Sequence, residues 1–277
     1  MTTSTTSPMN SVAGPDRVRT DDGVSIAYQV TGSGSRTVLA LHGWGGAGSG
    51  HSWHEVIRHL DLRSLRVVAI DLRGHGASGQ PDFGFTLERF GRDILAVADH
   101  AGAEKFVMIG YSMSGRWAQW ISCHFPARVL GQILIAPAPA SVLPLGDELL
   151  EGWMRESADR QKFEPWVRQF TSEPLAEGIL EAYFKDITRA SELAKRETFR
   201  MCCRDDFSAS LGATLAPTLV IAGNQDPMLS PEFLRQEVVA RIKGARLVRT
   251  DCGHEIPVER PAQAAALIEA FLAGLRD

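Results

Sequence analysis

Two serines lie two residues apart in the stretch GYSMSG, residues 110–115. An apolar run precedes this stretch and a helical pattern follows it, so a sharp turn must join the two. A side chain at the tip of such a turn projects clear of the backbone, and only small residues fit two positions before and after it. Ser112 has Gly110 and Ser114 at these positions, whereas Ser114 would be followed by the long Arg116. The spacing therefore predicts that Ser112 is a nucleophile and that Ser114 is its small neighbour.

A serine hydroxyl becomes a good nucleophile only when a base takes its proton and a third group orients that base. His254 lies in a loop between a strand-like run and the last helical pattern, and Asp226 follows another apolar run. Asp251 is a rival acid, but its closeness to His254 in the sequence makes the required approach of the two side chains awkward. We therefore predict a catalytic triad of Ser112, Asp226 and His254.

Attack of a hydroxyl on a carbonyl produces an oxyanion, which two backbone N–H groups can stabilise. Met113 follows the predicted nucleophile at the start of a helix, where the helix dipole favours negative charge. The glycine-rich loop HGWGG, residues 42–46, follows the first core strand, and its glycines allow the backbone to turn its N–H groups toward the site. The backbone N–H groups of Trp44 and Met113 are the predicted oxyanion hole.

Three histidines, His51, His54 and His59, cluster in the stretch HSWHEVIRH. This spacing is not HExxH, and on a helix His59 would point away from His54. The four cysteines form no CxxC pair, which favours reduced thiols in a cytoplasmic protein. We therefore expect no metal site and no cofactor, and we expect a cytoplasmic location.

The elements that must position these residues follow from short, continuous apolar runs, which are typical of strands buried on both faces. Such runs lie at residues 37–41, 67–70, 106–109, 133–135 and 219–221. Helical patterns lie between them, one starting at Thr86 and ending at Gly102, and a last one starting at Pro261. The alternation predicts an α/β fold with an open, mostly parallel β-sheet and helices on both faces. The three predicted catalytic side chains then share the carboxyl edge of the sheet.

The alternation stops between residues 141 and 210, where the pattern is only helical. This block holds 14 Asp and Glu against 10 Lys and Arg, so it carries the whole net charge of -4. An insertion after a strand is well placed to cover the ligand end of such a sheet. We predict a helical lid at 141–210 over a core formed by 17–140 and 211–277.

Aromatic residues of the predicted lid, together with one next to the nucleophile, favour an apolar substrate pocket. Packing of the lid against the core explains most of these aromatics equally well. The predicted pocket residues are Tyr111, Trp153, Trp166, Phe170 and Phe184.

Composition excludes other classes of protein. The chain has 277 residues, a net charge of -4 and no basic stripe, which argues against nucleic-acid binding. No run approaches the roughly 18 apolar residues of a membrane span. Residues 1–16 have no positive charge and no apolar block, so we expect a flexible tail rather than a secretory signal. The expected partner is a small molecule with a carbonyl and an apolar portion, and the sequence makes no prediction of oligomeric state.

Five motifs in order, LHGWGG, DLRGHGAS, GYSMSG, NQD and CGHE, resemble those of the α/β-hydrolase family over residues 15–277. Within the family the chain is similar to small bacterial esterases, lactonases, cofactor-free haloperoxidases and carbon–carbon bond hydrolases. Ser114 departs from the glycine usual at that position. One fold hosts many chemistries, so the resemblance leaves the substrate open.

The residues and the resemblance together lead us to expect a serine hydrolase that cleaves an ester, lactone or thioester through an acyl-enzyme on Ser112. Two alternatives remain at this point. The same triad could act on a carbon–carbon bond next to a carbonyl or as a lyase, or the chain could be a ligand-sensing receptor on the same fold.

Overall fold

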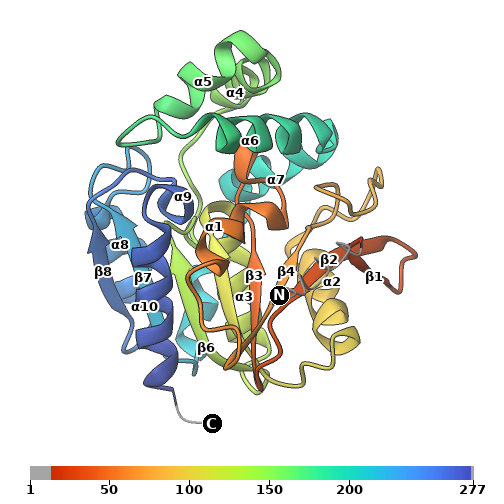
Figure 1. Cartoon of the computed structure of the whole chain (residues 1–277), viewed down its shortest axis with the longest axis vertical. Coiled ribbons are helices and arrows are strands. Elements are labelled where there is room, and N and C mark those ends of the chain that lie inside the picture. The colour runs from red at the N-terminus through yellow and green to blue at the C-terminus, as the bar shows by residue number, and fades with distance from the viewer. Residues whose placement is uncertain (1–13, 276–277) are drawn as a thin grey trace, which may run out of the picture.

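The computed structural model describes residues 14–275 of the chain (Figure 1). The tail predicted at 1–16 lies outside the described residues except for its last three. Of these, Asp16 is the first residue of strand β1.

Eight strands form one sheet in the order β1-β2-β4-β3-β5-β6-β7-β8. The strands from β4 to β8 in this order are parallel, as predicted, and β1 and β2 add an antiparallel edge. The antiparallel edge was not predicted, because β1 is largely exposed and β2 is buried over only three consecutive residues. The strands are β1 (Asp16–Arg19), β2 (Ser25–Thr31), β3 (Arg36–Leu41), β4 (Leu65–Ile70), β5 (Phe106–Tyr111), β6 (Val129–Ile135), β7 (Thr218–Gly223) and β8 (Arg246–Thr250).

Helices cover both faces of the sheet. The helices are α1 (His54–Ile57), α2 (Leu87–His100), α3 (Gly115–His124), α4 (Asp147–Ala158), α5 (Arg160–Arg168), α6 (Glu177–Arg189), α7 (Glu192–Arg204), α8 (Pro231–Glu237), α9 (Ile256–Glu259) and α10 (Pro261–Ala273). Successive side chains of a strand point to opposite faces. Accordingly, Leu39 belongs to the apolar cluster that includes residues of α2, α3 and α8, whereas its neighbour Val38 belongs to the cluster that includes residues of α1 and α10.

Helix α2 agrees with its sequence signals. The Thr86 hydroxyl accepts a hydrogen bond from the backbone N–H of Arg89 at 3.2 Å, which caps the helix. Gly102, two residues past the helix, has a φ of +69°. This left-handed conformation favours glycine and ends the helix.

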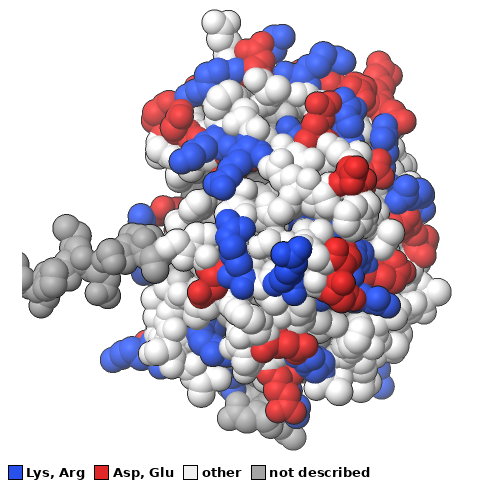
Figure 2. Space-filling model, turned by 90° about the vertical axis from the view of Figure 1, so that its right-hand side faces the viewer, with Lys and Arg blue, Asp and Glu red and all other residues white. Residues whose placement is uncertain are grey.

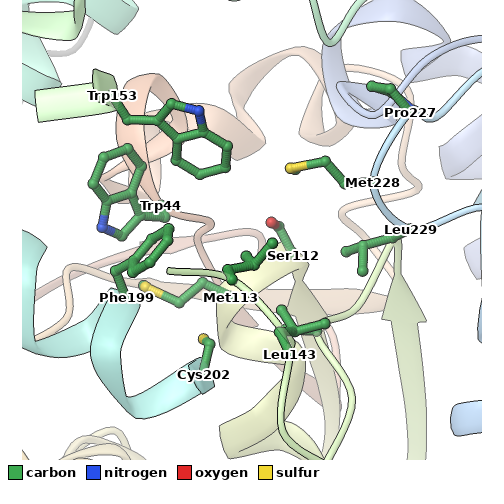
Figure 3. Close-up of a pocket in the computed structure, with 12 residues that line it drawn as sticks. Trp44, Ser112, Met113, Leu143, Trp153, Phe199, Cys202, Pro227, Met228 and Leu229 are labelled. Carbon is green, nitrogen blue, oxygen red and sulfur yellow. The ribbon is translucent and has the colours of Figure 1, made fainter. Parts of the chain in front are cut away.

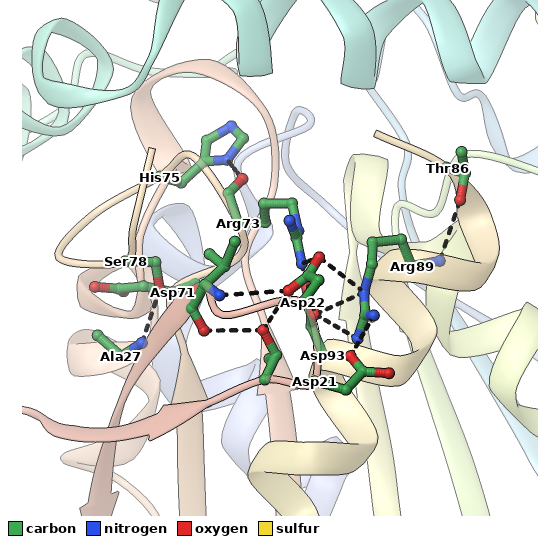
Figure 4. A network of polar contacts seen from close by, with 12 residues as sticks. Asp21, Asp22, Ala27, Asp71, Arg73, His75, Ser78, Thr86, Arg89 and Asp93 are labelled. Carbon is green, nitrogen blue, oxygen red and sulfur yellow. Dashed lines mark hydrogen bonds and ion pairs between the residues drawn. The ribbon is translucent and has the colours of Figure 1, made fainter. Parts of the chain in front are cut away.

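The turn after β4, which carries the DLRGHGAS motif, is held by a buried ionic network (Figure 4). The guanidinium of Arg73 donates to both carboxylate oxygens of Asp93 at 2.7 and 2.9 Å and to Asp22 at 2.7 Å. Asp71 accepts from the backbone N–H groups of Gly50 and Ala77, each at 2.7 Å. The motif therefore joins the antiparallel edge, α2 and the loop before α1.

Between β6 and β7 the chain forms α4, α5, α6 and α7, which lie together beyond one end of the sheet at the top of Figure 1. This segment, residues 141–210, is called the cap below. It contains no strand, and the whole of it is described. That the cap is a separate unit that acts as a lid remains our proposal.

Charged side chains of both signs are interspersed on the face shown in Figure 2. Among residues 14–275, no helix combines the length and the apolar character needed to cross a membrane.

Candidate active site

The turn at the end of β5 exposes Ser112. Its φ of +51° lies in the left-handed region, where a residue with a side chain is strained. A Cβ atom at position 110 would lie 2.8 Å from the carbonyl oxygen of Ser114 and 2.8 Å from the Cβ of Ala118, so only glycine fits there. The close packing explains why the turn is built from small residues.

Ser114 has a function in the turn that a glycine could not fulfil. Its hydroxyl lies 2.9 Å from the carbonyl oxygen of Leu41 at the end of β3, to which it donates. It also accepts from the backbone N–H of Tyr111 at 3.0 Å. Ser114 is fully buried, so these bonds are made out of contact with water. The side chain therefore ties the turn to the neighbouring strand.

The structure brings the three predicted triad residues together. His254 Nε2 lies 2.9 Å from the Oγ of Ser112, and His254 Nδ1 lies 2.6 Å from a carboxylate oxygen of Asp226. The other carboxylate oxygen of Asp226 accepts the backbone N–H groups of Met228 and Leu229, each at 2.9 Å. The predicted loops after β5, β7 and β8 meet at one edge of the sheet, as expected for parallel strands.

The rival acid, Asp251, is exposed and accepts a hydrogen bond from Gln225 at 3.3 Å. The two ring nitrogens of His254 are instead paired with Asp226 and Ser112.

Burial and neighbouring charge shift the pKa of His254 in opposite directions. Burial is the largest single influence and disfavours the protonated ring, but the Asp226 carboxylate, together with Glu255 and Glu259, outweighs burial and raises the pKa of His254 above its ordinary value. Burial would raise the pKa of Asp226, yet the contact with His254 and the two backbone N–H groups lower it overall. Asp226 is therefore the charged partner that favours proton uptake by His254.

The two residues of the predicted oxyanion hole flank Ser112 and line the same cavity. Trp44 has an extended backbone with φ −88° and ψ 160°, directly before a 3-10 turn at Gly45–Ala47. Glycine at position 43 allows close approach of this loop, because a Cβ there would lie 3.0 Å from the Tyr111 ring. Donation of their N–H groups to an oxyanion remains a proposal.

A cavity of about 270 Å³ opens beside Ser112 (Figure 3). Its walls come from the loop after β3, the turn between β5 and α3, the loop after β6, α4, α7 and the loop after β7. The lining residues are Trp44, Ser112, Met113, Ala138, Leu143, Leu145, Trp153, Phe199, Cys202, Pro227, Met228 and Leu229.

Four of the five predicted pocket residues are not in this lining, so that prediction is corrected. Only Trp153 lines the cavity. Trp166 and Phe170 of the cap pack against each other, with ring centroids 5.4 Å apart, and Phe184 packs against Phe163. Tyr111 is fully buried beneath the turn. These aromatic residues of the cap pack against the core as well as against one another, and the sequence does not distinguish this use from pocket lining.

Sequence reasoning also missed the residues that do line the cavity beside Trp153. Phe199 and Cys202 come from α7, and Leu143 comes from the loop after β6. Pro227, Met228 and Leu229 follow Asp226 directly, and their apolar character in a predicted catalytic loop was the one available signal.

A buried carboxyl group next to the base was missed as well. Glu255 accepts hydrogen bonds from the hydroxyls of Tyr111 at 2.7 Å and Tyr183 at 2.9 Å. Burial raises the pKa of Glu255. Glu255, the residue after His254, thus links Tyr111, the residue before Ser112, to Tyr183 of helix α6 in the cap.

Among residues 14–275, no group of three or more His, Cys, Asp and Glu side chains is placed to hold a metal ion. His51 lies 3.8 Å from Asp186 of α6, and His54 lies 3.3 Å from the side-chain oxygen of Gln29.

The chain is similar in sequence and in fold to known alpha/beta hydrolases. The profile of a family described as alpha/beta hydrolase fold matches residues 36–198. A non-heme haloperoxidase of Rhodococcus erythropolis is 27% identical, over 83% of this chain and 89% of its own length. A 3-oxoadipate enol-lactonase 2 of Acinetobacter baylyi is 26% identical, over 90% and 93%. The crystal structure of a hydrolase from Pseudomonas aeruginosa PA01 is similar with a TM-score of 0.82 and 27% identity, covering 95% of this chain and 100% of that one.

Proposed function

The chain belongs to the alpha/beta hydrolase fold family, and from this premise we propose that it is a serine hydrolase that cleaves a carboxylic ester, lactone or thioester. Ser112 is the nucleophile, His254 the base and Asp226 the group that orients the base. The observation that carries the proposal is the position of His254, with one ring nitrogen 2.9 Å from the Ser112 hydroxyl and the other 2.6 Å from Asp226. A relative named as an enol-lactonase supports an acyl-transfer reaction.

In the first half of the reaction, His254 Nε2 takes the proton of Ser112 as Oγ bonds to the substrate carbonyl carbon. The carbonyl oxygen becomes an oxyanion, which the backbone N–H groups of Trp44 and Met113 stabilise. His254 then gives its proton to the leaving oxygen or sulfur as that bond breaks, which leaves an acyl group on Ser112. Asp226 stabilises the imidazolium throughout.

In the second half, His254 takes a proton from water, and the resulting hydroxide oxygen bonds to the acyl carbon. The same N–H groups hold the second oxyanion. The bond to Ser112 breaks, Oγ recovers a proton from His254, and the carboxylic acid leaves. Every proton that His254 accepts is returned, so the free enzyme is restored.

An activated nucleophile can be tested without choosing a substrate. A fluorophosphonate probe reacts with a serine hydroxyl that has a functioning base, and peptide mapping identifies the modified residue. We expect a single label on Ser112 in the wild-type chain and none in Ser112→Ala. His254→Ala should lose the label although it keeps the serine. A label on Ser114, or no label on the folded wild type, would contradict the proposal.

A further inference from the structure

None of the described side chains that line the cavity beside Ser112 is charged. The polar groups among them are the hydroxyl of Ser112, the thiol of Cys202 and two indole N–H groups. The indole N–H of Trp44 already donates to the carbonyl oxygen of Lys195 at 2.8 Å. Away from the nucleophile, a substrate in this cavity therefore meets almost only carbon and sulfur.

Two buried cations belong to the helices that form the cavity, but both are bound to backbone carbonyls. Arg116 of α3 donates to the carbonyl oxygens of Pro139 and Ser141 at 2.5 and 2.9 Å, and also to that of Asp205. Lys195 of α7 donates to the carbonyl oxygen of Ile187 at 3.1 Å. Neither lines the cavity, so neither is placed to pair with an anionic substrate group.

The cavity walls lie on opposite sides of the nucleophile (Figure 3). Trp44, Trp153 and Phe199 form an aromatic wall, in which the ring centroids of Trp153 and Phe199 are 5.5 Å apart. Met228 and Leu229 form an aliphatic wall across from it. Flat rings pack well against the first wall and flexible chains against the second.

The volume limits the size of the group that fits. In another protein, a cavity of about 150 Å³ with an apolar lining holds one benzene molecule. The cavity here, about 270 Å³, is nearly twice as large. It therefore has room for roughly six to ten carbon atoms.

We propose that the site takes uncharged esters or lactones with an apolar chain or ring of about six to ten carbons, and that it rejects those whose buried part ends in a carboxylate. This inference rests on the proposed function for its chemistry, although the cavity itself can be tested by binding alone. A carboxylate that is buried against an apolar wall loses its hydration, and no cation or N–H group there replaces the lost hydrogen bonds.

The decisive comparison is between two p-nitrophenyl esters of equal acyl length, the hexanoate and the monoester of adipic acid. They differ by a terminal carboxylate. We expect kcat/KM for the hexanoate to be about 100-fold higher or more. Along the linear series from acetate to hexadecanoate, kcat/KM should be highest between about six and ten carbons. Ratios near one for the matched pair would overturn the proposal, and so would a rate that rises to the longest ester.

A variant can reverse the preference. Met228→Lys puts a cation on the aliphatic wall and should raise the adipate-to-hexanoate ratio of kcat/KM at least tenfold, because the carboxylate gains a partner. Met228→Gln has a similar length and no charge, and it should leave the ratio within about threefold. Equal ratios in the two variants would place the specificity outside this cavity.

Binding to Ser112→Ala separates the cavity from the chemistry. Calorimetry should find 2-heptanone, which is uncharged, bound at least tenfold more tightly than 6-oxoheptanoate, which has the same length and a terminal carboxylate. Equal binding of the two overturns the proposed substrate class even if the wild type proves to be a serine hydrolase. Preferential ketone binding together with an unlabelled wild-type serine would retain the apolar site and refute only the proposed reaction.

Discussion

At the scale of single residues, the candidate site depends on groups that hold strained or buried neighbours in place. Ser112 adopts a φ of +51°, which the surrounding contacts must maintain. Ser114 contributes through its bonds to Leu41 and Tyr111. Glu255 contributes from the other side, through the hydroxyls of two tyrosines. The reacting groups are few, but their positions depend on polar residues that do not react.

Ser114→Ala should lower stability and keep most of the activity, whereas Ser112→Ala should abolish activity and keep most of the stability. Ser114→Ala keeps a small residue but leaves a buried N–H and carbonyl without this partner, so we expect a loss of about 1–3 kcal/mol in the free energy of unfolding. Most hydrolysis of p-nitrophenyl esters should remain. Ser112→Ala should abolish hydrolysis without comparable loss of stability. Urea unfolding and initial rates measure the two effects, and the reverse pattern would refute the assignment of the nucleophile.

The pH profile should report the charge beside the base. His254 must be unprotonated to accept a proton, so kcat/KM falls as the pH drops below its pKa. Asp226 raises the pKa of His254 most strongly among the charged groups, and Glu255 and Glu259 raise it further. Glu255→Gln keeps an oxygen that accepts from the tyrosine hydroxyls but removes the negative charge. The acidic limb of the profile should therefore move to lower pH.

Tyr183→Phe is the control for this experiment, since it removes one hydrogen bond to Glu255 and no charge. Its acidic limb should coincide with that of the wild type. A limb that stays in place in Glu255→Gln, or that moves to higher pH, would contradict the prediction that the charge of Glu255 raises the pKa of His254.

At the scale of elements, helix α3 links the nucleophile to both ends of the cap. Its Arg116 donates to the carbonyl of Ser141, where the cap begins, and to that of Asp205, near its end. The backbone N–H of His254 in turn donates to the carbonyl of Phe170 at 2.7 Å. The cap therefore contacts both α3 and the loop that carries His254.

Arg116→Met should loosen the cap. Methionine fills similar space but leaves the three carbonyls without their donor, so we expect a loss of about 2–5 kcal/mol in the free energy of unfolding. Leu143 lines the cavity and lies two residues after Ser141, whose carbonyl Arg116 holds. Loss of this bond should therefore disturb substrate binding more than the reacting groups, so KM should rise more than kcat falls. Arg116→Lys retains a cation with a compact charge and should lose less. Unchanged unfolding and kinetics in Arg116→Met would contradict the role of this contact.

At the scale of the whole molecule, the cavity lies between the cap and the sheet and needs both. Trp153 and Phe199 come from the cap, and Ser112 and Met228 come from the loops at the sheet edge. A cavity shared in this way favours unfolding of the cap and the core as one cooperative unit.

Three thermal transitions should therefore coincide in the wild type. These are the loss of esterase activity, the change in tryptophan fluorescence and the loss of far-UV circular dichroism. In Arg116→Met, activity and fluorescence should be lost before the helical and sheet signal, because the cap loses its attachment to α3. A wild type that loses activity at a clearly lower temperature than its secondary structure would contradict a single unit.

The sequence by itself determined the features that depend on neighbours along the chain. Continuous apolar runs identified β3 to β7, and small residues around Ser112 identified the turn. Loops after predicted strands identified Asp226 and His254, since the carboxyl ends of parallel strands share one edge. These are local patterns with a direct physical cause.

Only the tertiary structure decided which side chains meet across the molecule. It separated the predicted aromatic residue that lines the cavity, Trp153, from those that pack elsewhere between the cap and the core, and it brought Glu255 against two distant tyrosines. It also showed that Ser114 bonds to β3. Such contacts join residues tens to more than a hundred positions apart. No periodicity encodes them, because they depend on how packed elements fit together in space.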